Sequence, residues 1–365
     1  NRHMFISRLN SFDPFQENFN ARKEPVGWMQ VGFNDSAWPQ AVAIANPPWA
    51  EPVPRDIPAM EEFPVTAKQI ERAEECVWLE NRPRPDDLSI ALSQVGKPLH
   101  YATIKNVKNL LTCKKPAVFQ CSTEHLRDRN FDGMYDPCVV LDFGRVITAY
   151  VELDVEGPAG ASVDTGVVER LIDGQFNNAI ECQFASRYTL KAGRQTWRSL
   201  AWRAFRYLKI RVRESTQPLK IHAVRAVVTR YPFEERGNFR SSDKKLNGVF
   251  EICRNTIRLC SNEFIMDTPW REQAQWLGDI SLISSGGIHA CFGDHRLTDK
   301  FYRQSTVAKR PEGLIQNVTS RDEPAGLRNI PDYSLWWVMG AWNQYLYTGN
   351  RQGLELYYPT MLSII

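Results

Sequence analysis

The spacing of hydrophobic residues changes once along this chain, near Gly237, and that change limits the possible folds. Before it, residues 151–155 alternate apolar Val, Leu and Val with acidic residues, which is the period-two pattern of a half-buried strand. After it, apolar residues recur every three or four positions over 246–260, which predicts an amphipathic helix. Strands followed by helices argue against the alternating pattern of a parallel α/β fold.

The first block predicts an antiparallel β-sandwich. Short apolar runs are separated by turn signals such as the Gly-Pro-Ala-Gly segment at 157–160, at the close spacing typical of sandwiches. The expected strands cover residues 151–155, 163–168, 188–190, 205–212 and 221–228.

The second block predicts consecutive helices. Ser242 is the expected N-cap of the first. Pro331 suits the first turn of a helix that Gly349 should end. The expected helices cover residues 246–260, 279–291, 295–308 and 331–348, with a fifth from Leu354.

Length and composition exclude several classes of function. A chain of 365 residues should form two or three domains. The formal net charge is only +3 and the basic residues are dispersed, so we expect no nucleic acid partner. No apolar run approaches the roughly 18 residues of a membrane span, so we expect no membrane partner either. No oligomeric state is predicted.

The eight cysteines indicate neither a disulfide framework nor a zinc site. They are scattered, without a C-x-x-C pair or a histidine at zinc-ligand spacing. Cys253 and Cys260 fall on the apolar stripe of the first helix and are expected to be buried thiols. We expect no cofactor and no catalytic metal; a structural calcium ion among the many acidic residues stays open.

Composition divides the chain into four regions: 1–62, 63–135, 136–236 and 237–365. In the first, Trp28 and Trp38 flank a turn-prone segment, which predicts short strands with both indoles in a core. The second is a connection with some strands. Because the chain opens at Asn1 and ends in a predicted helix, we expect both ends to be cut edges. The location is then periplasmic or secreted if an export signal precedes Asn1, and cytoplasmic otherwise.

Residues 267–279, Asp-Thr-Pro-Trp-Arg-Glu-Gln-Ala-Gln-Trp-Leu-Gly-Asp, are the strongest candidate for a functional site. Three carboxylates, one arginine and two tryptophans lie within a loop that enters a helix. Indole rings offer flat apolar faces to the C–H side of a sugar, and carboxylates bind hydroxyls or move protons. The alternative is a solvated helix face with an ordinary arginine–carboxylate pair.

The same string resembles the signature of bacterial α-L-rhamnosidases, glycoside hydrolase family 78, written D-C-P-x-R-(D)E…W-x-G-D. Thr268 stands where the family usually has Cys. Further resemblances follow in the family's order along most of the chain. They are Trp28 to Trp38, Asp142-Phe143-Gly144, Phe205-Arg206-Tyr207, Gly237 to Asn247, and Ile330 to Ser334 followed by Trp336-Trp337.

The resemblance implies a fold and an activity. Residues 1–62 would end a galactose-binding-like β-sandwich, 136–236 would form a second sandwich, and 237–365 would begin an (α/α)6 six-hairpin barrel. The expected activity is release of terminal α-L-rhamnose, with inversion, from a rhamnose-containing carbohydrate. Inversion needs two carboxyl groups roughly 6.5–9.5 Å apart, one as acid and one as base.

Glu272 matches the family's general acid. Its pKa must then lie above its ordinary value, and repulsion from Asp267 and Asp279 with burial against Trp276 would raise it. Arg271 would lower it if it pairs directly with Glu272. Alternatively, Arg271 holds Asp267 or a sugar hydroxyl.

The remaining candidates would bind the sugar. Asp267 and Asp279 match hydroxyl-binding residues of the family, with helix capping as the alternative for both. Trp276 and Trp336 are candidate walls of the pocket, and core packing is the alternative for Trp336. Asp332 is a candidate ligand that also suits the first turn of a helix.

The general base has no counterpart among these residues. In the family it is a glutamate late in the barrel, so we expect it after Ile365 and expect a protein ending there to be inactive. Two rivals remain: a six-hairpin glycosidase acting on another sugar, and a non-catalytic carbohydrate-binding protein. Thr268 and the missing base motivate the second rival.

Overall fold

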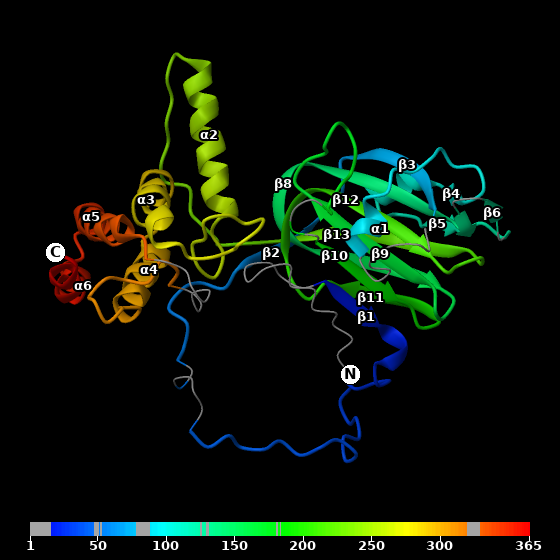
Figure 1. Ribbon diagram of the computed structural model, residues 1–365, viewed down its shortest axis with the longest axis horizontal. Helices are drawn as coiled ribbons and strands as arrows, with labels where there is room; N and C mark the ends of the chain where they lie inside the picture. Colours follow the sequence, from blue (N-terminus) through cyan, green and yellow to red (C-terminus); the bar gives the residue numbers. More distant parts are fainter. Residues whose placement is uncertain are drawn as a thin grey trace.

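The computed structural model describes residues 16–46, 51, 53–77, 88–124, 126–128, 131–179, 182, 184–319 and 329–365. A large β-sheet domain is followed by a helical region, and the two lie side by side, with the sheet domain on the right in Figure 1. Across these residues, every helix is too short or too polar to span a bilayer.

Eleven strands form the main sheet, and β6 (Leu126–Asp128) with β7 (Phe131–Gly133) forms a separate hairpin. A short helix, α1 (Leu88–Leu92), and two 3₁₀ turns, η1 (Ala21–Lys23) and η2 (Val107–Leu111), lie between strands. The eleven strands are β1 (Glu17–Asn20), β2 (Glu61–Val65), β3 (Gln69–Val77), β4 (Thr103–Lys105), β5 (Ala117–Gln120), β8 (Tyr135–Gly157), β9 (Ser162–Val168), β10 (Ala185–Thr189), β11 (Gly193–Arg198), β12 (Arg203–Arg213) and β13 (Leu219–Arg230).

The long strand β8 joins the two halves of this sheet. Its first half pairs with β3 and β12, and its second half pairs with β11 and β13. The pairs between described strands are antiparallel except that of β1 with β10. Val151, Leu153 and Val155 are buried, whereas the acidic residues between them are partly exposed. The predicted alternation is therefore confirmed, and all five expected strands are present.

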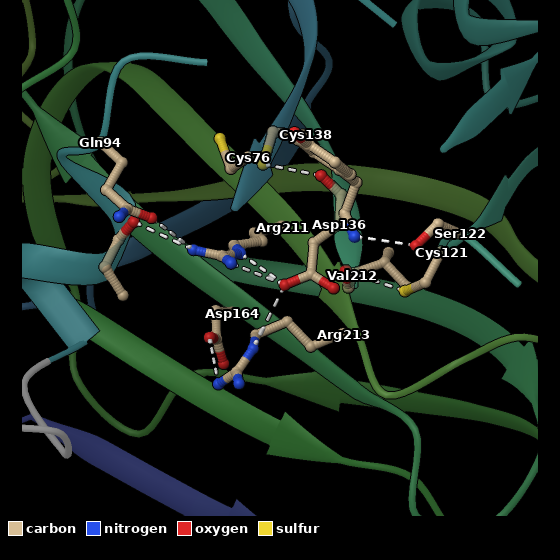
Figure 2. Close-up of polar contacts among 12 residues, drawn as sticks. Cys76, Gln94, Cys121, Ser122, Asp136, Cys138, Asp164, Arg211, Val212 and Arg213 are labelled. Atoms are coloured by element: carbon tan, nitrogen blue, oxygen red, sulfur yellow. Dashed lines mark hydrogen bonds and ion pairs between the residues drawn. The ribbon is translucent and has the colours of Figure 1, made fainter. Parts of the chain in front are cut away.

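Charged residues as well as apolar ones are buried inside the sheet domain. Lys209, Arg211 and Arg213 lie on one face of β12 and are all buried. The Arg211 Nε and Nη2 atoms donate to Asp136 Oδ2 over 2.9 and 2.6 Å, and Arg213 also reaches Asp136, as Figure 2 shows. Lys209 pairs with Glu74 over 2.7 Å. Such charges are tolerated inside because each lies in an ion pair with a buried carboxylate.

Two of the sequence motifs form a single ion pair. Arg206 donates two hydrogen bonds of 2.8 Å to the Asp142 carboxylate. Asp142 Oδ1 also accepts from the Gly144 N–H over 2.6 Å, and Gly144 has φ +83°, which favours glycine. Both strands are irregular here, since the β12–β8 register shifts between Phe205 and Tyr207. The motifs at 142–144 and 205–207 thus hold the sheet together.

The helical region has its own core. It includes the large buried side chains Phe301, Tyr302, Trp337 and Tyr357. The helices are α2 (Lys244–Leu259), the π-helix η3 (Asp279–Ser284), α3 (Ser285–Cys291), α4 (Arg296–Val307), α5 (Pro331–Thr348) and α6 (Arg351–Ile364). They confirm the five predicted helical segments. The last begins at Arg351 rather than Leu354, because the Asn350 side chain accepts from the Gly353 N–H.

Two details of the first predicted helix were wrong. Asp243, not Ser242, is the N-cap of α2, since its carboxylate accepts from the Lys245 N–H over 2.7 Å. Cys253 is exposed, although Cys260 is buried as predicted. The reason is that no residue of α2 is fully buried against the described part of the chain, and its apolar stripe packs against the helical core only near its end, at Ile257.

The prediction for Trp28 and Trp38 was also wrong. Residues 21–46 contain one 3₁₀ turn and several further turns but no strand. The two indoles are 44% and 46% exposed, so neither belongs to a core. Their contacts are local: Trp28 Nε1 donates to Glu24 over 3.1 Å, and Trp38 packs on Phe33 at 5.4 Å.

Candidate active site

Four of the candidate residues, Asp267, Arg271, Glu272 and Trp276, lie on a loop between α2 and η3, whereas Asp279 begins η3 and Asp332 and Trp336 lie on α5. The loop closes on itself because the Asp267 N–H donates to the Ala274 carbonyl and the Ala274 N–H donates to Asp267 Oδ1, each over 3.0 Å. Gln273 takes a left-handed conformation, φ +49°, and its side chain donates to the Pro269 carbonyl. Asp267 therefore caps this loop and does not cap a helix.

Trp270 anchors the loop to the β-sheet domain. Its ring is buried in the core of that domain and meets the Phe184 ring edge-on at 4.7 Å. On the other side, the Leu277 N–H donates to the Asn317 carbonyl over 2.7 Å and Trp276 forms a β-bridge with Val318. The loop is therefore held from both the sheet domain and the helical region. A rigid support of this kind suits a site that must keep its geometry.

Glu272 is held by three neighbours. The Trp276 indole donates to Glu272 Oε2 over 2.7 Å. The Arg271 guanidinium contacts Glu272 Oε1 directly, and the Asp267 carboxyl is hydrogen-bonded to Glu272 as well. The Glu272 side chain keeps only 15% of its surface exposed, whereas Arg271 keeps 58%.

The two carboxyl groups hold their protons unequally. Burial, followed by the hydrogen bond with Glu272, raises the pKa of Asp267 to about 7. Burial also acts to raise the pKa of Glu272, but hydrogen bonds from Asp267 and Trp276 and the charge of Arg271 outweigh it, so the pKa of Glu272 lies below its ordinary value. Of the two carboxyl groups that share this hydrogen bond, Asp267 therefore keeps its proton to the higher pH. This direction is opposite to the one expected from the sequence, and the direct Arg271–Glu272 contact is part of the cause.

Tyr333 connects the other candidates, and the sequence analysis assigned it no role. Its hydroxyl donates to Asp279 Oδ2 over 3.2 Å. Its ring meets Trp276 edge-on at 6.4 Å and stacks on Trp336 at 5.8 Å, which forms one aromatic row. Trp336 is only partly buried, so it is not a core residue. The signal was its place next to Asp332, inside the motif at 330–334.

Tyr333 also lies near the acidic candidates Asp279, Asp332 and Asp267, because the charge of each acts on its pKa. Burial and then Asp279 raise the pKa of Tyr333 to about 12, with smaller contributions from Asp332 and Asp267. Asp332 itself is exposed in the first turn of α5. The structure thus gathers all seven predicted site residues around the loop, with Asp332 at its edge.

This arrangement can move a proton between two carboxyl groups beside an aromatic surface. A shared proton, a nearby cation and indole rings suit acid–base chemistry on a polar ligand with apolar faces. Among the described residues, no group of three or more His, Cys, Asp or Glu side chains is placed to hold a metal ion.

Comparisons with known proteins agree over both regions. Residues 134–229 match the concanavalin-like domain of bacterial α-L-rhamnosidases, and residues 234–365 match the 6 hairpin glycosidase domain of the same enzymes. An α-L-rhamnosidase of Formosa agariphila is 24% identical over 287 residues, which is 71% of this chain and 29% of that protein.

Solved structures show the same fold. The GH78 family rhamnosidase of Bacillus sp. GL1 superposes with a TM-score of 0.64 at 23% identity, over 77% of this chain and 28% of that chain. The Streptomyces avermitilis α-L-rhamnosidase complexed with L-rhamnose gives 0.63 at 19% identity, over 97% and 28%. A rhamnosidase from Klebsiella oxytoca with rhamnose bound gives 0.61 at 16% identity, over 85% and 56%. The chain spans less than a third of the curated relative's length.

Proposed function

Because this chain belongs to the bacterial α-L-rhamnosidase family, glycoside hydrolase family 78, we propose that the protein hydrolyses terminal α-L-rhamnosides. The observation that carries the proposal is the Asp267–Glu272 pair, which holds one shared proton beside Trp276 on the anchored loop. Glu272 is the proposed general acid. The reaction proceeds with inversion, and a further carboxylate, which is none of the seven site residues, activates water.

Proton donation by Glu272 needs a change in its surroundings. In the free site Asp267 keeps its proton to a higher pH than Glu272 does, while Arg271 stabilises the Glu272 anion. A sugar that draws Arg271 onto one of its hydroxyls removes that stabilisation. The proton can then pass along the existing hydrogen bond to Glu272 and on to the glycosidic oxygen. The low pKa of Glu272 thus marks a resting state, which sugar binding reverses.

The other residues bind the rhamnose. Tyr333 positions Asp279, which accepts hydrogen bonds from sugar hydroxyl groups, as does Asp332. Asp267 also accepts from a hydroxyl group while it keeps its hydrogen bond to Ala274. Trp276 and Trp336 supply flat faces for the apolar side of the ring.

The helical region is the first part of an (α/α)6 six-hairpin barrel in this proposal, and 136–236 forms its sandwich partner. The outward apolar stripe of α2 supports the barrel. Leu246, Val249 and Ile252 are 52%, 54% and 68% exposed, as in a helix that packs against further helices.

A second candidate is a protein that binds such sugars without hydrolysing them. The direct Arg271–Glu272 contact and the low pKa of Glu272 favour it, since an ionised Glu272 donates no proton. In that case Asp267, Asp279 and the aromatic row keep their binding roles.

The test is hydrolysis by the full-length protein. It is given p-nitrophenyl α-L-rhamnoside and matched aryl glycosides of glucose, galactose, mannose and arabinose. We expect turnover of the rhamnoside at least tenfold above any other, with the β-anomer of rhamnose as the first product by NMR. Turnover of another glycoside only would overturn the substrate. Rhamnose binding by calorimetry without any turnover would favour the second candidate.

A further inference from the structure

A second site lies where the sheet domain meets α2. A cavity of about 560 Å³ opens there, a size typical of ligand pockets. Figure 1 shows the lower end of α2 approaching β2 and β8 at this junction. Its walls come from β2, from residues 143–148 of β8, from the end of β13 and from the last turn of α2. We call this cavity the basic groove.

The charge of the basic groove is one-sided. Lys68, Arg145, Arg230 and Arg258 line it, and none of the described residues that line it is Asp or Glu. Arg230 pairs with Glu61 over 2.8 Å and Arg258 with Glu235 over 2.6 Å, so these two charges are balanced from outside the groove. Lys68 and Arg145 have no ion pair within the described part of the chain, and both are exposed. Two uncompensated positive charges therefore face this cavity.

The fold fixes the backbone that carries these two cations. Gly144 turns the backbone at φ +83°, and the Asp142 carboxylate holds that turn through the Gly144 N–H. Arg206 in turn holds Asp142. Arg145 follows the turn directly, and the stem of Lys68 lies so close to Gly144 that an added Cβ there would stand 3.2 Å from Lys68 Cγ. The motif at 142–144 thus presents a pair of cations.

The other walls include groups that suit a sugar ring. Phe63 is a partly buried aromatic wall, while Thr66 and Asn255 offer hydrogen-bonding groups. The groove also adjoins the acid-bearing loop: Leu259 lines it, and the next residue, Cys260, places its thiol 3.7 Å from the Asp267 carbonyl. A glycan that reaches the loop therefore has this groove as its neighbour.

We propose that the basic groove binds an anionic sugar residue, carboxylated or sulfated, of a glycan. Arginine and lysine recognise both groups through charge-assisted hydrogen bonds. The choice of a sugar over another anion rests on the proposed glycosidase function. Binding of an anionic sugar does not require catalysis. A negative result in the binding test can therefore be told apart from a negative result in the hydrolysis test.

The test is calorimetry on the full-length protein with three oligosaccharides of equal length. They are a galacturonate trimer, a sulfated galactan trimer and a neutral galactose trimer. We expect at least one anionic trimer to bind at least tenfold more tightly than the neutral one, with an affinity that falls as salt rises. The anionic trimer that binds more tightly identifies the anion. Equal binding of all three, or no binding of either anionic trimer, would overturn the proposal.

A matched pair of variants locates the site. Lys68→Gln with Arg145→Gln removes both uncompensated charges and should weaken anionic binding at least tenfold. Lys244→Gln with Lys245→Gln removes the same charge from the exposed start of α2, about 20 Å along the helix from the groove. This control should change the affinity for the anionic trimer less than twofold. Equal effects of the two double variants would place the anion elsewhere. Turnover of an aryl rhamnoside, which carries no anion, should be the same in both.

Discussion

Asp267 and Glu272 share a hydrogen bond across the loop that precedes η3, and their pKa values move in opposite directions. Burial and the bond to Glu272 raise the pKa of Asp267 to about 7, and Glu272 stays ionised between Arg271 and Trp276. Asp267 is therefore the carboxyl group of the pair that keeps its proton to the higher pH. The predictions below concern this proton and the residues that hold the pair in place.

Asp267→Asn should remove a pH dependence of stability. A carboxyl with a higher pKa in the folded than in the unfolded chain stabilises the fold fully below its unfolded pKa, here 3.8. That contribution is lost as pH rises towards about 7. The asparagine variant stays neutral over this range. Its free energy of unfolding, relative to that of the wild type, should therefore increase between pH 4 and 7 by on the order of 2 kcal/mol and then level off. Denaturant titrations at several pH values measure it, with the exposed Asp332→Asn as control. A constant difference would contradict the shared proton.

Glu272→Gln should lower turnover of natural rhamnosides by the full-length protein at least about 100-fold, since a positioned general acid contributes that much. The loss should be smaller for a dinitrophenyl rhamnoside, whose leaving group needs no proton. The control is Glu251→Gln, which removes a carboxylate that is 58% exposed on α2. Equal losses on both substrates would show that Glu272 is not the acid.

Arg271→Gln should raise the pKa of Glu272, because one stabilising charge is removed from its anion. A general acid works while protonated, so the alkaline limb of the profile of kcat/KM against pH should move to higher pH. KM should rise as well if Arg271 binds a hydroxyl. The control is Arg236→Gln, since Arg236 is 65% exposed and pairs with Glu234 outside the site. An unchanged alkaline limb would mean that Arg271 does not set this pKa.

Tyr333→Phe should weaken rhamnose binding while the aromatic row is kept. It removes the 3.2 Å hydrogen bond to Asp279, a loss of about 1 kcal/mol or roughly fivefold in affinity. Tyr358→Phe, at a tyrosine that is 56% exposed on α6, should have no effect. Calorimetry with L-rhamnose measures both. If the two variants bind alike, Tyr333 does not position Asp279.

Gly278→Ala should disturb the site by contact alone. A Cβ at Gly278 would lie 2.4 Å from Tyr333 Cδ1, although the backbone there is helical and accepts any residue. Overpacking of this kind costs about 1–3 kcal/mol, and rhamnose binding should fall with it. Gly286→Ala on α3 meets nothing within 4 Å and should stabilise the helix slightly. Equal unfolding free energies for the two variants would contradict this packing.

Local patterns were enough to predict the order of strands and helices. The alternation at 151–155 and the stop at Gly349, φ +66°, each depend on a few neighbouring residues and were confirmed. Failures occurred where burial depends on distant segments. Cys253 lies on a predicted apolar stripe, yet it is exposed, because periodicity gives the apolar face of a helix and not what covers it.

The candidate site divides in the same way. Sequence alone determined that acids, an arginine and indoles are concentrated at 267–279, because that is a matter of residue identity and spacing. Only the tertiary structure decided that the pKa of Asp267 is raised, that Tyr333 reaches Asp279 from α5, and that Asp142 and Arg206 form one pair. Each of these depends on the distance between groups far apart in the chain or on their burial, and charge interactions change steeply with both.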